Sequence, residues 1–150
     1  MIILMKRYLT FLFLLLGSVN SIIHAQQSDT YKDALSALKA KVIVTKGLLP
    51  RSYGDGITLE EIGLNLKGEK FFSFGYRMNG YHLEGIENDN TQVKEWIKEN
   101  LLINDPSQKS FISNLVICEI PLIYGFYNDN DDLLIISFDT EELKEILSKL

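Results

Sequence analysis

The sequence predicts an α+β fold, in which an antiparallel β-sheet of about five to six strands carries its helices mainly on one face. Two observations predict this class. Apolar residues recur at helical spacing in three separate segments, and in the segments between them they alternate with polar residues as they do in strands. The strands also come in groups rather than alternating singly with helices, which favours antiparallel pairing. The predicted order of elements is α-βββ-α-ββ-α.

The first helix is predicted to begin at Ser28 or Asp29, because either side chain can cap its first turn. Apolar side chains then recur at helical spacing, at Tyr31, Leu35, Leu38 and Val42. Gly47 and Pro50 end the helix. The segment that follows, RSYGDG at 51–56, is predicted to be a loop.

An antiparallel meander of three strands is predicted between residues 57 and 86. Apolar and polar side chains alternate over 62–67 and again over 72–79, and Gly68 lies in the polar turn between them. Asn79-Gly80 tolerates the positive φ angles of a type I′ turn, so the chain is expected to return as a third strand over 81–86. The meander therefore has one apolar face.

The second helix is predicted to start at Asn90 or Thr91 and to end between Asn100 and Pro106, with an apolar stripe formed by Val93, Trp96, Ile97 and Leu101. A long apolar run follows over 111–127 and is assigned to strands. Pro121 interrupts this run, and because proline lacks an N–H it marks an edge position, a bulge or a break between two strands.

The chain is predicted to end in a strand over 133–138 and a helix. Asp139 and Glu142 match the capping-box pattern at the start of that helix. The apolar face of the helix consists of Leu143, Ile146, Leu147 and Leu150.

The amino terminus has the pattern of a secretory signal peptide over residues 1–25. Lys6 and Arg7 precede an apolar segment over 8–16, and Ala25 offers a small residue for cleavage. The start of translation can be Met1 or Met5. The apolar segment is shorter than the roughly 20 residues of a membrane span, so we expect no stable membrane anchor after cleavage. Residues 26–150 then form a single exported domain, periplasmic or secreted.

The charge of the mature chain argues against two classes of partner. Of the 15 basic side chains two lie in the leader, which leaves 13 against 20 acidic ones, a net charge of −7. Such a balance argues against binding to nucleic acid or to anionic lipid through bulk charge. No Lys or Arg occurs between Lys109 and Lys144, so the late part of the chain is the more acidic. Cys118 is the only cysteine, which excludes an internal disulfide framework, and its apolar surroundings predict that it is buried.

The loop YNDNDDL over 127–133 is the strongest candidate for a metal site. Asp129, Asp131 and Asp132 offer carboxylates for a weak calcium site, but the spacing lacks the glycine that an EF-hand loop requires at its sixth position. Strand-like segments flank the loop, and Asn and Asp suit turns. A hairpin turn is therefore the favoured interpretation, and no cofactor is predicted.

The sequence offers little for catalysis. His82 is the only histidine of the mature chain, and it is the sole conventional base that could serve a small hydrolase. The sequence has no nucleophile elbow, no phosphate-binding loop and no pair of metal-ligating residues at the usual spacing. A solvent-facing histidine is the favoured interpretation, so the protein is predicted not to be an enzyme.

The aromatic residues beside the turns form a candidate binding surface. Tyr81 and Tyr127 can anchor a partner there, together with the carboxylates of Asp129, Asp131 and Asp132. The neighbours Phe71 and Phe72 must point to opposite faces of their strand, so one of them leaves the apolar stripe.

The order strand, Asn-Gly turn, strand, helix and strand, ending in IPLIYGF, resembles the carboxy-terminal domain of TonB-type energy transducers over residues 70–126. The chain departs from that domain by continuing into a further hairpin and helix. The function favoured overall is that of an exported, non-enzymatic protein that binds another envelope or secreted macromolecule, most simply a protein. The alternatives are a small-ligand carrier, a small hydrolase using His82, and a domain similar to that of TonB.

Overall fold

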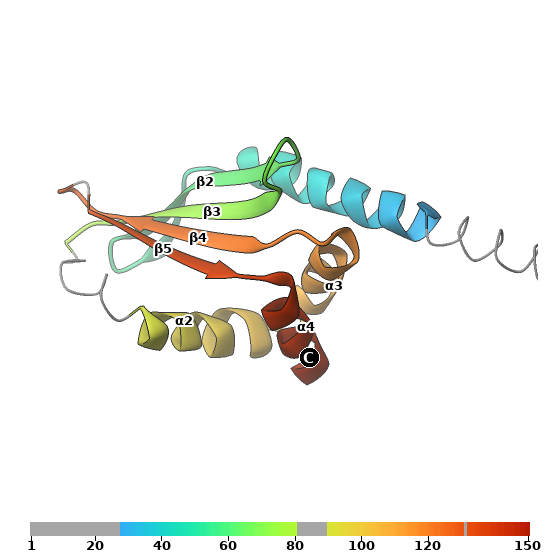
Figure 1. Cartoon of the computed structure of the whole chain (residues 1–150). Helices are drawn as coiled ribbons and strands as arrows, with labels where there is room; N and C mark the ends of the chain where they lie inside the picture. Colours follow the sequence, from blue (N-terminus) through green and yellow to red (C-terminus); the bar gives the residue numbers. More distant parts are fainter. Residues whose placement is uncertain (1–27, 81–89, 131) are drawn as a thin grey trace, which may run out of the picture. The chain divides into compact units, whose positions relative to one another are not determined.

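The computed structural model describes residues 28–80, 90–130 and 132–150. In these ranges the chain forms a five-stranded mixed sheet with helices packed against it, so the predicted α+β class is confirmed (Figure 1). The strands lie side by side in sequence order: β1 (Arg51–Gly54), β2 (Ile57–Asn65), β3 (Phe71–Met78), β4 (Leu122–Tyr127) and β5 (Leu133–Phe138).

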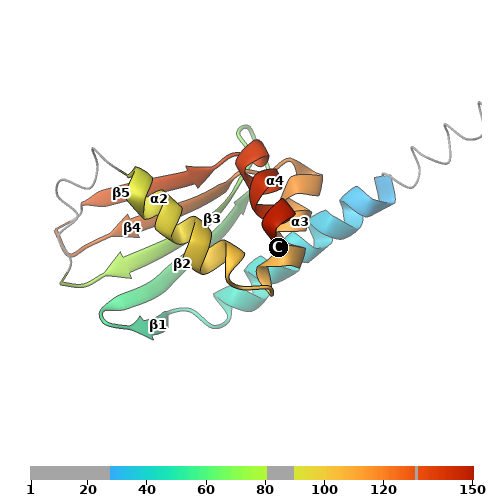
Figure 2. The ribbon, with the colours of Figure 1, turned by 90° about the horizontal axis from the view of Figure 1, so that it is seen from below.

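The helices lie mainly on one face of the sheet, as predicted, and Figure 2 shows α2, α3 and α4 in front of that face. The helical segments are an N-terminal helix over 28–46, α2 (Thr91–Ile97), its π-helical continuation η1 (Lys98–Ile103), α3 (Gln108–Cys118) and α4 (Thr140–Lys149).

The chain divides into two compact units, residues 1–33 and residues 34–150. In the first unit the structure describes the beginning of the N-terminal helix, over 28–33. The second unit holds the rest of that helix, the sheet and the later helices. Within the described ranges, no helix combines the length and the apolar character that a membrane crossing requires.

The prediction of a purely antiparallel sheet is wrong at one place, because β3 and β4 run parallel. The other neighbouring strands pair antiparallel. A parallel pair needs a crossover that carries the chain back to the same end of the sheet. Here α2, η1 and α3 provide that crossover, since all of them lie between β3 and β4 in the sequence.

The first half of the apolar run 111–127 forms helix α3 and not a strand. Its buried side chains are Phe111, Ile112, Leu115 and Cys118, a helical spacing that a uniformly apolar run conceals. Glu119 ends the helix in the left-handed conformation, with φ of 53°. The Ile120 N–H then donates to the carbonyl of Leu115 over 2.9 Å, which is the closing bond of a Schellman motif. Glycine usually occupies such a left-handed position after a helix. Because a glutamate stands here instead, the sequence does not indicate that a helix ends at this point.

The predicted loop RSYGDG is a β-hairpin. Ser52 pairs with Thr58, and Gly54 pairs with Ile57. Asp55 and Gly56, the two residues of the turn, have φ angles of 49° and 77°, as a type I′ turn requires. The predicted third strand of the meander, 81–86, lies outside the described residues.

The hydrophobic core lies between the sheet and the helices. Alternate side chains of the central strands point into it, including Phe72 of β3, Leu122 of β4 and Ile136 of β5, none of which is more than 1% exposed. The helices contribute Leu38, Ile97, Leu102, Ile112, Leu115, Leu143 and Ile146. Cys118 is also buried, as predicted, and burial raises the pKa of its thiol.

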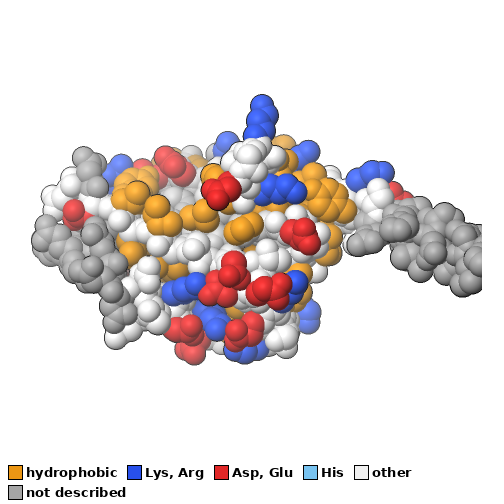
Figure 3. All heavy atoms as spheres, in the orientation of Figure 1, with side chains coloured by type: hydrophobic (Ala, Val, Ile, Leu, Met, Phe, Trp, Pro, Cys, Tyr) orange, Lys and Arg blue, Asp and Glu red, His pale blue; other side chains and the backbone are white. Residues whose placement is uncertain are grey.

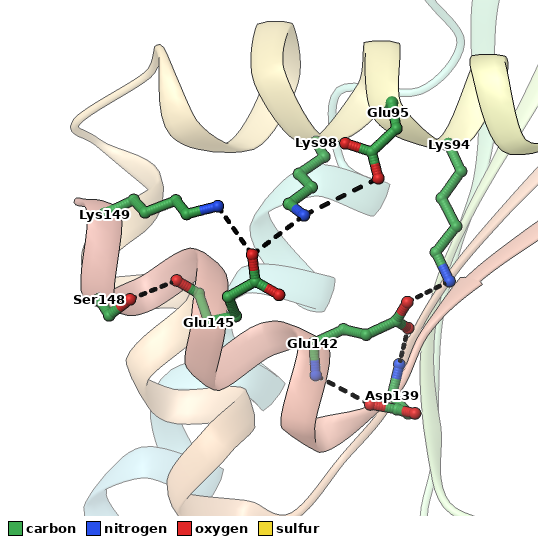
Figure 4. A network of polar contacts seen from close by, with 8 residues as sticks. All are labelled: Lys94, Glu95, Lys98, Asp139, Glu142, Glu145, Ser148 and Lys149. Atoms are coloured by element: carbon green, nitrogen blue, oxygen red, sulfur yellow. Dashed lines mark hydrogen bonds and ion pairs between the residues drawn. The ribbon is translucent and has the colours of Figure 1, made fainter.

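Ion pairs between the crossover and α4 hold the helix layer together (Figure 4). Lys94 of α2 pairs with Glu142, and Lys98 of η1 reaches Glu145 over 3.3 Å. Glu142 also completes the predicted capping box: its backbone N–H donates to the Asp139 carboxylate, and its own carboxylate accepts from the Asp139 N–H, both over 2.9 Å. Two acidic residues of α4 are therefore neutralised within the chain, and α2 is fixed over the sheet.

Candidate functional site

The structure offers two candidate surfaces, one on each face of the sheet. The first is a groove between the helices and the strands, here called the helix-side groove. It consists of two cavities that share Tyr53, Tyr76 and Leu101 in their walls. The second is the sheet face that no described helix covers, here called the open sheet face.

One cavity of the helix-side groove, here the apolar chamber, has a volume of about 400 Å³. Its walls are entirely apolar or aromatic. The helical wall consists of Val93, Trp96, Ile97 and Leu101, and the strands contribute Tyr53, Ile57, Tyr76, Met78, Phe126 and Leu134. Trp96 stands at the rim with 55% of its surface exposed, although the sequence predicts it on the buried stripe of its helix. A tryptophan in this place is typical of a binding site.

The other cavity, here the polar chamber, has a volume of about 470 Å³. Two cations, Lys41 and Arg51, and one carboxylate, Asp105, line it. Asp105 is already engaged, since it accepts hydrogen bonds from the Ser107 N–H and the Gln108 side chain, both over 3.0 Å. Hydrogen bonds from the Ser107 and Gln108 side chains, and then from the Ser107 N–H, lower the pKa of Asp105, so its carboxylate is ionised.

Lys41 is the half-buried cation of the polar chamber. Its ammonium nitrogen lies 4.6 Å from the centroid of the Phe111 ring. Burial lowers the pKa of Lys41, and the charge of Asp105 partly offsets that effect. An additional anion in the chamber would favour the charged form of this lysine.

Stacked aromatic rings form the floor of the groove. Tyr76 of β3 lies 5.5 Å from Phe126 and 6.3 Å from Tyr124 of β4, measured between ring centroids. Phe74 stacks on Tyr124 over 5.5 Å. Burial raises the pKa of both Tyr76 and Tyr124 above the ordinary range of tyrosine, so their hydroxyls stay neutral. The floor therefore carries no charge.

The open sheet face carries exposed aliphatic side chains on the edge strand β5. Leu133 is 52% exposed and Ile135 is 54% exposed, whereas their neighbours Leu134 and Ile136 point into the core. Next to Ile135 in the sheet stand two paired glycines, Gly125 and Gly75. The face beside these aliphatic side chains is therefore flat. In Figure 3, hydrophobic side chains gather along the layer of the sheet, while acidic and basic ones intersperse over the helices below it.

A β-bulge in β2 places two acidic side chains at the border of the open sheet face. The sequence Leu59-Glu60-Glu61-Ile62 places two polar residues between two apolar ones, which simple alternation cannot satisfy. The register shifts between Leu59 and Glu61, so that Leu59 and Ile62 both stay in the core. As a consequence Glu60 and Glu61 both point to the open sheet face.

Glu60 is the centre of a polar cluster on that face. Its carboxylate accepts a hydrogen bond from the Tyr127 hydroxyl over 2.7 Å and another from Arg77 Nε over 2.9 Å. Arg77 also stacks 4.7 Å from the Tyr127 ring and approaches Asp129 within 3.9 Å. The pKa of Tyr127 is raised to about 12, chiefly by burial and then by Glu60. The cluster joins three strands and the loop after β4.

We expect replacement of Tyr127 by phenylalanine to raise the pKa of Glu60 toward the ordinary value of glutamate. In the native cluster the hydrogen bond from Tyr127 lowers this pKa most, and the one from Arg77 adds to it. The cluster thus stabilises the fold above the pH at which an unfolded glutamate titrates, and this contribution is lost as the pH falls through the folded pKa. Carboxyl NMR titration of both proteins measures the change. An identical Glu60 titration in the variant would contradict the role of the hydroxyl.

Two of the predicted binding residues, Tyr127 and Asp129, meet in this cluster. Asp132 does not join them, because its carboxylate accepts a hydrogen bond from the Asn128 side chain over 2.8 Å within the hairpin loop. Tyr81, Asp131 and the possible base His82 lie outside the described residues, so the calcium site and the hydrolase stay untested predictions. Among the described residues, no three His, Cys, Asp or Glu side chains come together as metal ligands would.

Two members of the cluster, Glu60 and Arg77, are not among the binding residues that the sequence predicts. Arg77 could have been found, because it falls on the polar side of the alternation over 72–79. Glu60 depends on the bulge, which the two adjacent glutamates signal only weakly. The helix-side groove was missed as well, since its walls come from β1 and from two helical segments distant in the sequence.

Comparisons with known proteins identify the fold alone. No family model matches the chain, and no curated protein matches it. A Pseudomonas aeruginosa protein described as a putative secreted protein superimposes with a TM-score of 0.54 at 12% identity, covering 76% of this chain and 96% of that one. EpsS, the pilotin of the Vibrio vulnificus type 2 secretion system, superimposes with a TM-score of 0.52 at 11% identity, covering 77% and 96%. The described chain therefore has a fold similar to the folds of these two proteins.

Proposed function

We propose that this protein is exported and that it binds a protein partner of the cell envelope or the secreted fraction, without catalysing a reaction. The observation that carries the proposal is the open sheet face, where Leu133 and Ile135 stand more than half exposed beside the polar cluster around Glu60. Aliphatic side chains next to a Tyr and an Arg are typical of a protein-binding surface.

Two further observations support export and a protein partner. The signal-peptide pattern over residues 1–25 directs the chain out of the cytoplasm. One of the proteins that share its fold is the pilotin of a type 2 secretion system, and the other is described as a putative secreted protein.

A photo-crosslinking amino acid at position 135 is expected to trap the partner when the full chain is produced with a carboxy-terminal affinity tag in its own cell. The matched control places the same amino acid at position 43, because Ile43 is also an exposed aliphatic residue, 72% exposed, on the N-terminal helix. Parallel samples with calcium and with a chelator test whether the loop after β4 contributes. The expected result is a crosslinked protein adduct that forms from position 135 and not from position 43.

The double variant Leu133→Asp/Ile135→Asp is expected to reduce capture of the same partner by at least about tenfold, since it puts two charges where apolar contacts form. The variant Ile43→Asp should capture as much as the wild type. Equal adducts from positions 43 and 135, or full capture by the double variant, would contradict the assignment of the open sheet face. Capture that needs calcium would assign the loop over 128–132 a calcium-dependent role.

A further inference from the structure

We propose that the helix-side groove binds a single-chain amphiphile with an anionic headgroup, of the fatty-acid class. The hydrocarbon chain would lie in the apolar chamber and the headgroup in the polar chamber. The helix-side groove lies on the face of the sheet opposite to the one proposed for the protein partner. An experiment can therefore contradict one proposal without contradicting the other.

The apolar chamber fits a hydrocarbon chain better than a peptide. No charged or amide side chain lines it, and its floor is made of stacked rings. A peptide in extended form would bring N–H and C=O groups that need hydrogen-bond partners, and these walls offer only two tyrosine hydroxyls. A hydrocarbon chain has no such groups. The volume of about 400 Å³ lies in the range of small-molecule sites.

The polar chamber supplies the charge that an anionic headgroup needs. Lys41 and Arg51 line it, and no described carboxylate forms an ion pair with either of them. The one acidic residue of its wall, Asp105, already accepts hydrogen bonds from Ser107 and Gln108. The chamber therefore keeps an excess of positive charge in a chain that is acidic as a whole. The net negative charge of the chain does not account for two cations in one chamber, whereas a binding site for an anionic ligand does.

The two chambers meet at a junction suited to the join between head and chain. Tyr53 of β1 and Tyr76 of β3 stand there, with ring centroids 6.1 Å apart, and each borders both chambers. A tyrosine offers both an apolar ring and a polar hydroxyl, which suits a boundary between apolar and polar surroundings. One ligand can therefore occupy both chambers.

Trp96 provides the measurement, because it is the only tryptophan of the chain and stands at the rim of the apolar chamber. Titration with dodecanoate below its micellar concentration is expected to give a saturable shift of Trp96 fluorescence to shorter wavelength. Dodecyltrimethylammonium, which has the same chain and the opposite charge, should bind at least about tenfold more weakly. Acetate, which has the headgroup without the chain, should cause no change.

The variant Lys41→Gln/Arg51→Gln separates headgroup recognition from apolar binding. It should bind dodecanoate at least about tenfold more weakly and bind the uncharged dodecanol as the wild type does. Circular dichroism checks its folding, and the single variant Arg51→Gln gives the same test at an exposed position if the double variant unfolds. The Leu133→Asp/Ile135→Asp variant of the opposite face should bind dodecanoate unchanged.

Three results would overturn the proposal. The first is the absence of a Trp96 response to dodecanoate. The second is equal affinity for the anionic and the cationic amphiphile, which would indicate unspecific detergent binding. The third is unchanged dodecanoate affinity in the charge variants.

Discussion

Replacing Phe72 with alanine is expected to lower the free energy of unfolding by about 3–5 kcal/mol, the range for truncating a buried phenylalanine. Phe72 is fully buried near the start of β3, the central strand of the sheet. Its ring contacts Phe111 of α3 edge to face, with centroids 5.0 Å apart, and lies 5.4 Å from Phe74. Truncation would leave a cavity between the sheet and the crossover helix, where few side chains can move in to fill it. Urea denaturation followed by circular dichroism measures the loss.

The adjacent Phe71 gives a matched control for this prediction. It has the same side chain on the same strand, but it points to the open sheet face and is only partly buried. The Phe71→Ala variant should lose no more than about 1 kcal/mol, as substitutions away from the core usually do. Similar losses in the two variants would mean that the pattern of faces described for β3 is wrong.

Replacing Asn128 with alanine is expected to cost roughly 2–4 kcal/mol of stability, because it removes three hydrogen bonds of a buried side chain. Asn128 is 2% exposed at the start of the loop between β4 and β5. Its side-chain oxygen accepts from the backbone N–H groups of Asn130 and Asp132, each over 3.0 Å, and its amide donates to the Asp132 carboxylate over 2.8 Å. One side chain thus ties Asn130 and Asp132 to the end of β4. Thermal and urea unfolding measure the cost.

Two further variants of the loop test the mechanism of this loss. Asn130→Ala removes an exposed side chain and leaves its backbone N–H, so it should be nearly neutral. Asn128→Asp keeps the accepting oxygen but sets a second carboxylate against Asp132, so its cost should lie between those of the other two. A cost for Asn130→Ala as large as that for Asn128→Ala would show that the loop is held in some other way.

The elements with a strong local signal were predictable from the sequence. The capping box of Asp139 and Glu142 and the alternation over β3 depend on contacts between near neighbours, so their residue patterns are sufficient. The same holds for the prediction that Phe71 and Phe72 diverge. The α+β class follows from these elements together.

The tertiary structure decided what depends on distant contacts. Helix α3 has an apolar sequence that suits a strand, and it is helical because one of its faces packs between the sheet and α4. The parallel pairing of β3 with β4 follows from that helix, since only a crossover can bring the two strands together in this way.

The residues of the candidate sites fall into the same two groups: some follow from local sequence patterns, and others come together only through contacts between distant segments. Tyr127 and Asp129 could be chosen from the sequence because aromatic and acidic residues beside a turn are a local pattern. Their partners Glu60 and Arg77, and the walls of the helix-side groove, come from segments far apart in the chain. The sequence by itself determined the export pattern, the α+β class and the capping box of α4. The tertiary structure alone brought Lys41 and Arg51 to one cavity and left Leu133 and Ile135 exposed, because burial and proximity between distant segments arise only when the sheet and its helices pack.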